Sequence, residues 1–226
     1  DLKTNTLGTL MLLNWCRDND IKRFCYTSSM SIYGDQPHIP INENVLASPK
    51  SFYGIGKHAS ELYMSMYDSV GIASTAYRLF NVYGPGQNMS NLRQGMVSIF
   101  LEQLHKKKNL LVKGCLERFR DFIYIDDVIN CFMQTLDDPV TYGKSYNVGT
   151  GIKTTVRSLI ENMIEIYGTD CGNIPIEIVH GTLGDQFGIF ADITKINNET
   201  GWAPATSLNV GLTKMVSWIK KSDPCQ

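Results

Sequence analysis

Tyr53 and Lys57 form the first pair of residues in this sequence whose types and spacing suit acid–base chemistry. They stand four residues apart at the start of a segment with helical periodicity, which places both side chains on one face of the helix. A cation beside a phenol favours phenolate, so Lys57 is expected to lower the pKa of Tyr53 from about 10 and make it a general base. A surface contact on an ordinary helix is the simpler alternative, and the spacing alone leaves both open.

Hydroxyl groups at Thr27-Ser28-Ser29 provide a second candidate feature. They follow a short apolar run that predicts a buried strand over residues 21–28, and α/β proteins build their sites at the carboxyl ends of such strands. A hydroxyl there can share a substrate proton with Tyr53. A turn or a helix cap is the alternative role for these side chains.

The segments around these residues follow the order strand, loop, helix, strand, which is typical of a parallel α/β sheet. The periodicity predicts a helix over 5–17, a strand over 21–28, an irregular connection over 34–50, a helix over 51–69, a strand over 72–79 and a turn-rich exit over 80–86. The pattern loosens after residue 87 and predicts a smaller mixed lobe. Its expected elements are a helix near 94–106, a strand near 109–113, a helix beginning near Asp126-Asp127, a strand within 143–151 and helices over 155–167 and after 207.

Composition excludes several classes of partner. The chain has 226 residues, 43% of them hydrophobic, and 21 basic against 22 acidic residues, as in an ordinary globular protein. A net charge of -1 gives no reason to expect nucleic acid or an anionic membrane as partner. No stretch reaches the roughly 20 apolar residues of a membrane span. The six cysteines contain no C-x-x-C pair, so we expect no metal site and reduced thiols in the cytoplasm.

Several longer motifs carry a resemblance. They are TSSMSIYG, Tyr53-Gly54-x-Gly56-Lys57 followed by Glu61, YRLFNVYGPGQ, RFRDFIYIDDV, YNVGTG and the spaced GD, AD, K and GW-x-P near the C-terminus. Together they resemble the extended short-chain dehydrogenase/reductase family of NAD-dependent epimerases and dehydratases, above all its UDP-glucose 4-epimerase-like members. The resemblance implies a partial Rossmann-type parallel sheet over residues 1–86. Residues 87–226 would form mainly a mixed α/β substrate-binding lobe, with some segments returning to the first domain.

The resemblance also implies a role for each matching residue. Tyr53 would be the catalytic base, Lys57 would bind the nicotinamide ribose and lower the Tyr53 pKa, and Ser29 would hydrogen-bond the sugar hydroxyl. The remaining implied contacts are with NAD (Asn5, Phe80 and Val82) and with the substrate (Asn81, Arg120 and Asp185). Each has a structural alternative: a turn residue for Asn81, a surface ion pair with Asp121 or Asp126 for Arg120, and a core position for Phe80.

The sequence departs from the family pattern in three places. It contains no G-x-x-G-x-x-G loop, whose amides hold the pyrophosphate of NAD, and it begins at Asp1 within a helical pattern, so we expect an upstream part to be missing. Thr182 stands where many members carry a phosphate-binding arginine. Met30-Ser31 replaces the Asp-Glu pair of the 4,6-dehydratases, which favours epimerisation.

The resulting hypothesis is an NAD-dependent nucleotide-sugar epimerase of the UDP-hexose 4-epimerase type, acting by transient hydride abstraction. Two alternatives remain at this stage: an inactive fragment or subunit that binds a nucleotide-sugar or pairs with another chain, and a dehydratase or reductase of the same family. We also expect a homo-oligomer, formed through an unpaired sheet edge or through the helices at 5–17 and 51–69.

Overall fold

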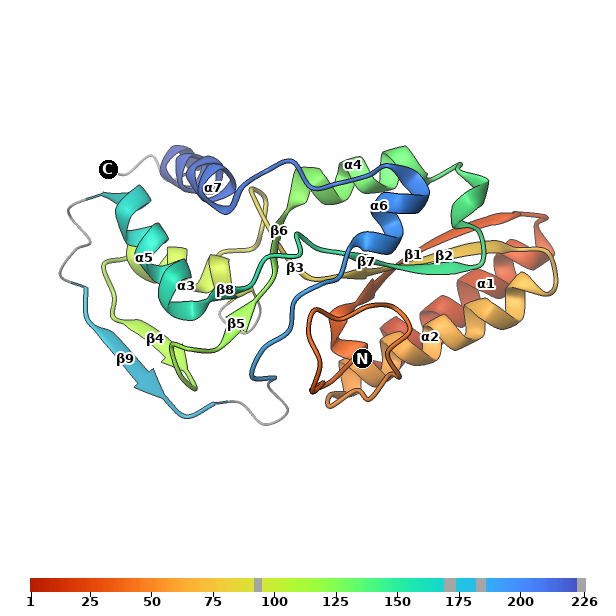
Figure 1. The fold of residues 1–226 in the computed structure, drawn as a ribbon, viewed down its shortest axis with the longest axis horizontal. Helices are drawn as coiled ribbons and strands as arrows, with labels where there is room; N and C mark the ends of the chain where they lie inside the picture. Colours follow the sequence, from red (N-terminus) through yellow and green to blue (C-terminus); the bar gives the residue numbers. More distant parts are fainter. Residues whose placement is uncertain (92–94, 169–173, 182–185, 223–226) are drawn as a thin grey trace.

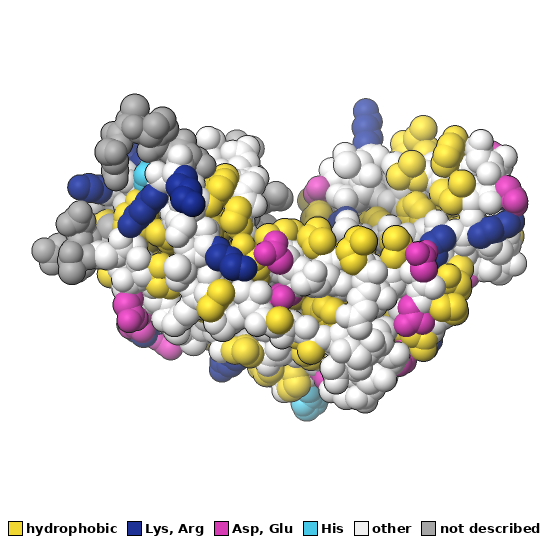
Figure 2. Space-filling view, turned by 90° about the horizontal axis from the view of Figure 1, so that it is seen from above, with side chains coloured by type: hydrophobic (Ala, Val, Ile, Leu, Met, Phe, Trp, Pro, Cys, Tyr) yellow, Lys and Arg dark blue, Asp and Glu magenta, His cyan; other side chains and the backbone are white. Residues whose placement is uncertain are grey.

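The computed structural model describes residues 1–91, 95–168, 174–181 and 186–222 (Figure 1). The molecule is elongated, with a parallel sheet and two long helices at one end and a group of helices around an apolar core at the other. Seen from above, its outline is indented between the two ends (Figure 2). None of the helices in the described ranges has the length and apolar character needed to span a bilayer.

The first part of the chain forms the elements that carry the Tyr53–Lys57 pair. They are η1 (Leu2–Leu7), α1 (Gly8–Asp18), β1 (Arg23–Ser29), η2 (Met30–Ile32), α2 (Phe52–Asp68) and β2 (Ala73–Leu79). The bounds of α2 confirm the helix predicted over 51–69. The helix begins after Ser51 because Ser51 Oγ accepts a hydrogen bond from Gly54 N at 3.0 Å and caps the first turn. The predicted strands over 21–28 and 72–79 correspond to β1 and β2, and the helix over 5–17 corresponds to α1 with the π-helical η1 before it.

A parallel sheet in the order β1–β2–β7 positions the site, with β7 spanning Lys144–Val148. β1 pairs with β2 up to Ser29↔Leu79, and β7 pairs with the other side of β2 up to Leu79↔Val148. The three strands therefore end at one edge of the sheet, which is where parallel α/β proteins place their ligands. The predicted α/β fold with a Rossmann-type sheet is confirmed.

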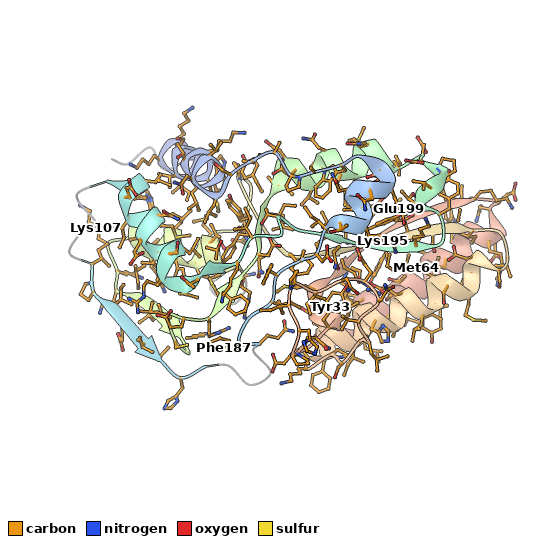
Figure 3. All side chains as sticks on the ribbon, in the orientation of Figure 1. Tyr33, Met64, Lys107, Phe187, Lys195 and Glu199 are labelled. Carbon is orange, nitrogen blue, oxygen red and sulfur yellow. The ribbon has the colours of Figure 1, made fainter. Side chains whose placement is uncertain are left out.

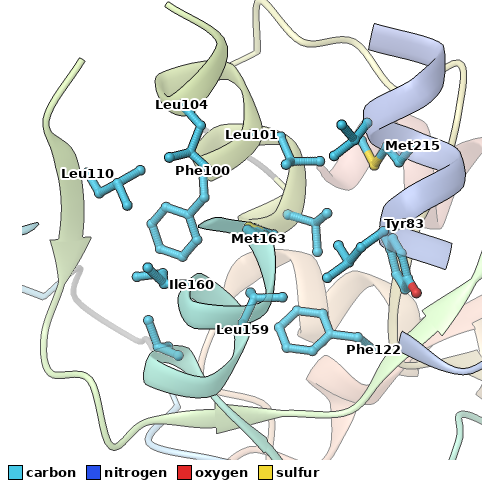
Figure 4. Close-up of a cluster of buried hydrophobic side chains, with 14 of the residues drawn as sticks. Tyr83, Phe100, Leu101, Leu104, Leu110, Phe122, Leu159, Ile160, Met163 and Met215 are labelled. Carbon is cyan, nitrogen blue, oxygen red and sulfur yellow. The ribbon is translucent and has the colours of Figure 1, made fainter. Parts of the chain in front are cut away.

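The second part of the chain contributes shorter strands and the remaining helices. They are β3 (Asn81–Tyr83), α3 (Met96–His105), β4 (Leu110–Lys113), β5 (Phe119–Arg120), β6 (Phe122–Tyr124), α4 (Ile125–Thr135), η3 (Pro139–Thr141), β8 (Thr154–Thr155), α5 (Val156–Tyr167), β9 (Ile176–Val179), α6 (Thr194–Thr200) and α7 (Leu208–Ser222). β3 pairs with β6 and β4 with β9 in parallel, while β5 and β8 are antiparallel. Leu101, Leu159 and Met163 lie at the centre of the apolar core that joins α3, α5 and α7 (Figure 4).

Several elements differ from the sequence-based expectation. β3 lies within the predicted turn-rich exit, and the strands β5, β6, β8 and β9 and the helix α6 were not expected. β3 has only three residues and forms because Asn81 N donates to Asp121 O at 2.9 Å, forty positions along the chain. A strand defined by so distant a partner leaves no local periodicity to detect.

Candidate active site

Ser29 and Tyr53 line one cavity of about 340 Å³ at the carboxyl edge of the sheet. The other lining residues come from η2, the end of β2, β3, β6, the segment that leads into α3 and the first turn of α3: Met30, Ser31, Leu79, Phe80, Asn81, Val82, Gln87, Gly95, Met96, Val97 and Phe122. The structure thus brings together five of the residues singled out from the sequence: Ser29, Tyr53, Phe80, Asn81 and Val82.

Gly54 allows α2 to approach the loop after β1. A Cβ atom at this position would lie 2.4 Å from the backbone oxygen of Ser31, closer than any real contact. Because Gly54 follows Tyr53 directly, this close approach brings the first turn of α2, and the phenol with it, against the Ser29–Ser31 segment. The glycine in the Tyr-Gly-x-Gly-Lys motif therefore has a packing role.

Ser29 combines the two roles considered for it. Its Oγ accepts a hydrogen bond from Ser31 N at 3.2 Å and so caps η2, and it donates to Ser31 Oγ at 3.1 Å. The same side chain lines the cavity together with Tyr53. A helix cap and a substrate contact are therefore compatible at this position.

Lys57 lies one turn beyond Tyr53 and is buried, with 7% of its surface exposed. Its Nζ donates to the backbone oxygen of Thr27 at 2.8 Å, and it lies 4.6 Å from the ring centroid of Tyr26 and 5.6 Å from that of Tyr53. Burial lowers the pKa of the Lys57 ammonium. The lysine borders the phenol from the side of the sheet and is not among the residues that line the cavity.

The predicted lowering of the Tyr53 pKa is not found. Burial raises the pKa of Tyr53, and hydrogen bonding with Ser29 offsets this only in part. The physical reason is that the phenol lies against protein, where ionisation is costly, while the Lys57 ammonium is directed at the Thr27 carbonyl.

Two further predicted residues lie outside the cavity lining. The backbone oxygen of Asn5 accepts hydrogen bonds from Thr9 Oγ1 at 2.6 Å and Ser60 Oγ at 2.7 Å, which ties η1 to α2. Arg120 is buried and donates to backbone oxygens, namely those of Phe119, Gln186 and Phe187 at 2.7, 2.8 and 3.1 Å. A surface ion pair, the alternative for Arg120, is therefore excluded. Asp185 and Thr182 lie outside the described residues.

The aspartates near Arg120 have structural partners. Asp121 is fully buried and accepts hydrogen bonds from the backbone N–H groups of Thr150, Gly151 and Ala191. Asp127 accepts from those of Ala205 and Thr206. Both carboxylates thus hold loops together. In the described part of the chain no three His, Cys, Asp or Glu side chains are grouped so as to hold a metal ion.

Gln87 was not identified from the sequence, although it ends the YGPGQ motif. It lines the cavity, and its Oε1 is buried without a hydrogen-bond partner in the described structure. An unpartnered acceptor at a cavity wall suits a ligand that carries hydroxyl donors. Gln87 and Tyr53 meet at the cavity because of how the chain folds after β3, which local periodicity does not reveal. The YGPGQ motif was therefore the available sequence signal for Gln87.

Comparison with known proteins agrees with the parallel α/β fold. The family model described as "NAD dependent epimerase/dehydratase family" matches residues 1–149. A putative UDP-glucose 4-epimerase of Methanocaldococcus jannaschii is 31% identical, over 97% of this chain and 70% of that protein. The chain therefore belongs to the NAD-dependent epimerase/dehydratase family.

Solved structures support the same assignment. A UDP-glucose 4-epimerase of Thermotoga maritima, determined with UDP-glucose, has a TM-score of 0.91 and 31% identity, over 98% of this chain and 71% of that one. A UDP-glucuronic acid 4-epimerase of Bacillus cereus, in complex with UDP-glucuronic acid and NAD, has a TM-score of 0.89 and 26% identity, over 97% and 68%. Other relatives are named for a reductase and a decarboxylase, so the family includes several reactions on nucleotide-sugars.

Proposed function

We propose that this chain forms the nicotinamide- and sugar-binding part of an NAD-dependent epimerase that inverts C4 of a UDP-hexose. The observation that carries the proposal is the meeting of Ser29 and Tyr53 at one cavity, on the carboxyl edge of a parallel sheet. The names of the M. jannaschii and T. maritima relatives support a UDP-hexose as the substrate.

The residues around the cavity suit NAD. Leu79, Phe80 and Val82 offer an apolar wall for the face of a nicotinamide ring. Lys57 Nζ donates to one carbonyl in the described structure, and an ammonium has three donors, so ribose hydroxyls can be bound as well. When bound, NAD supplies reversible hydride acceptance. On this proposal residues 1–86 serve mainly the cofactor and residues 87–226 mainly the substrate.

Tyr53 and Ser29 would handle the proton. In its ionised form, Tyr53 would take the proton of the C4 hydroxyl, and Ser29 would hold that hydroxyl by a hydrogen bond. In the return step, Tyr53 would give the proton back to the C4 oxygen. None of the described lining residues carries a carboxylate, which disfavours the dehydratase alternative.

Substitution of Tyr53 tests this role. Tyr53→Phe keeps the ring and removes the base, so kcat for interconversion of UDP-glucose and UDP-galactose with NAD, followed by NMR, should fall about 10²–10⁴-fold. Tyr63→Phe, on the same helix at an exposed position, is the control and should leave kcat unchanged. Equal rates for Tyr53→Phe and the unmodified chain would exclude Tyr53 as the base, and an inactive unmodified chain would favour the binding-subunit alternative.

We also propose that two copies associate through α1 and α2. Both helices expose large apolar side chains one turn apart, Met11 and Trp15 on α1 and Leu62 and Met66 on α2, each at least 56% exposed. A two-helix layer of this kind can pack on its own copy as a four-helix bundle. Trp15→Glu with Met66→Glu should give a monomer in light scattering, whereas Val210→Glu on α7 should not; a monomeric unmodified chain would contradict the proposal.

A further inference from the structure

A buried ion pair between Glu61 and Arg78 lies directly beside the candidate active site. Arg78 Nη2 and Glu61 Oε2 are 2.7 Å apart, and their side chains are only 11% and 8% exposed. Arg78 Nε also donates to both carboxylate oxygens, at 3.1 and 3.2 Å. Paired charges with several hydrogen bonds in a poorly solvated place have a fixed mutual geometry.

Glu61 connects this pair to the residues of the site on two sides. It follows Tyr53 and Lys57 at four-residue intervals, so the three side chains share one face of α2. Its Oε1 accepts a hydrogen bond from Ser28 Oγ at 2.5 Å, and Ser28 immediately precedes Ser29 at the end of β1. One carboxylate therefore joins the helix that carries Tyr53 to the strand that carries Ser29.

Arg78 extends the connection across the sheet. Ser28, Arg78 and Asn147 are partners in register on β1, β2 and β7. Arg78 Nη1 donates to Tyr33 Oη at 2.9 Å, and Tyr33 Oη donates to Asn147 Oδ1 at 2.6 Å. Ser29 begins the segment that contains η2, and Tyr33 ends it. The Arg78 guanidinium therefore holds this segment at the Tyr33 end.

We propose that Glu61 and Arg78 are positioning residues that hold Ser29 at the hydrogen-bonding position opposite Tyr53. Neither residue is among those that line the cavity, so they act through Ser28 and Tyr33. The importance of this geometry for catalysis rests on the proposed function, but the geometry itself can be measured without it.

The test reads the ionisation of Tyr53 in the full chain by NMR of ¹³Cζ-labelled tyrosine, with Tyr53→Phe to assign the signal. Glu61→Gln should loosen the Ser28–Ser29 segment and weaken the Ser29 hydrogen bond. The Tyr53 pKa should then rise by about half to one unit, as expected for the loss of one hydrogen bond to a phenolate. Ser28→Ala leaves the ion pair in place and should give a smaller rise, which keeps the test available if Glu61→Gln does not fold.

Glu199→Gln is the matched control. The Glu199 carboxylate also accepts from a lysine and a tyrosine, Lys144 at 2.7 Å and Tyr146 at 2.5 Å. It lies on α6, apart from Tyr33 (Figure 3). This variant should leave the Tyr53 titration unchanged. An unchanged titration in folded Glu61→Gln and Ser28→Ala, or an equal shift in Glu199→Gln, would overturn the proposal.

Activity supplies an independent second readout. If the chain epimerises UDP-glucose, Glu61→Gln should lower kcat at least about tenfold with little change in KM, because a displaced Ser29 weakens the transition state more than substrate binding. Absence of activity in every variant counts against the proposed function alone, since the Tyr53 titration needs neither substrate nor cofactor.

Discussion

The sheet end of the molecule combines apolar cores with a network of buried polar side chains, whereas the helical end rests mainly on one large apolar core. Around β1, β2 and β7 the buried side chains include Ser28, Lys57 and Asn147, each with specific hydrogen-bond partners. Around α3, α5 and α7 the core consists of packed apolar side chains such as Leu101 and Leu159. Buried polar networks fix geometry at little net gain in stability, whereas apolar burial stabilises without fixing polar groups. We therefore expect substitutions at the first end to affect mainly the site and those at the second mainly stability.

Truncation of the apolar core should give the largest loss of stability. Leu159 is fully buried in the cluster shared by α3, α5 and α7, so Leu159→Ala should lower the free energy of unfolding by about 2–5 kcal/mol. Urea unfolding measures this loss. NAD affinity, measured at a temperature where the variant is folded, should stay unchanged; a parallel loss of affinity would show that the two ends are not separable.

Gly54→Ala should affect both the site and stability. The added Cβ meets the Ser31 oxygen at 2.4 Å, so the first turn of α2 must move away, at a cost of about 1–3 kcal/mol. Chemical denaturation and the Tyr53 titration together should show both effects. Gly8→Ala is the control, because its Cβ would make an ordinary 3.4 Å contact with Lys3 O, and equal behaviour of the two variants would argue against the close approach.

Alkaline pH should weaken the sheet end gradually. Burial raises the pKa of Tyr77 to about 12 and raises the pKa values of Tyr33 and Tyr146 as well. These phenols therefore stay protonated to a higher pH in the folded state than in the unfolded state. Their contribution is complete below about pH 10, the unfolded value, and is lost as pH rises through the folded values, by at most about 1.4 kcal/mol per pH unit for each tyrosine.

Urea unfolding between pH 8 and 11.5 measures this slope. Tyr77→Phe should reduce it, although the variant also loses the 2.7 Å hydrogen bond to Thr135 and starts from a lower stability. A free energy of unfolding that stays constant above pH 10 would contradict the raised pKa values.

Local signals explain why much of the sheet end could be predicted from the sequence. Ser51 caps α2 because its hydroxyl can accept a hydrogen bond from a backbone N–H of the first turn. The apolar runs of β1 and β2 end in hydroxyl-bearing and turn residues, which mark strand ends. The convergence of Ser29 and Tyr53 followed from the parallel order of strand and helix. These features depend on neighbours within a few residues.

Features that depend on distant contacts were not predicted. β3 requires Asp121, the inclusion of Gln87 in the cavity requires the chain after β3, and the direction of the Tyr53 pKa shift is set by burial. The Glu61–Arg78 pair illustrates the same limit. Glu61 and Arg78 each stand within a motif, but their pairing across the fold could not be seen in the sequence.

The most direct test of the account is calorimetric titration of the full chain with NAD, in the presence of UDP, compared with Lys57→Ala. The chain is expected to bind NAD, and Lys57→Ala should weaken binding at least about tenfold, or about 1.4 kcal/mol, because the variant removes the ammonium expected to hold the ribose. Lys50→Ala, which removes a half-exposed lysine paired with Asp35, should bind NAD as the unmodified chain does. Equal affinity of the Lys57→Ala variant and the unmodified chain, or no binding at millimolar NAD, would contradict the proposed cofactor site.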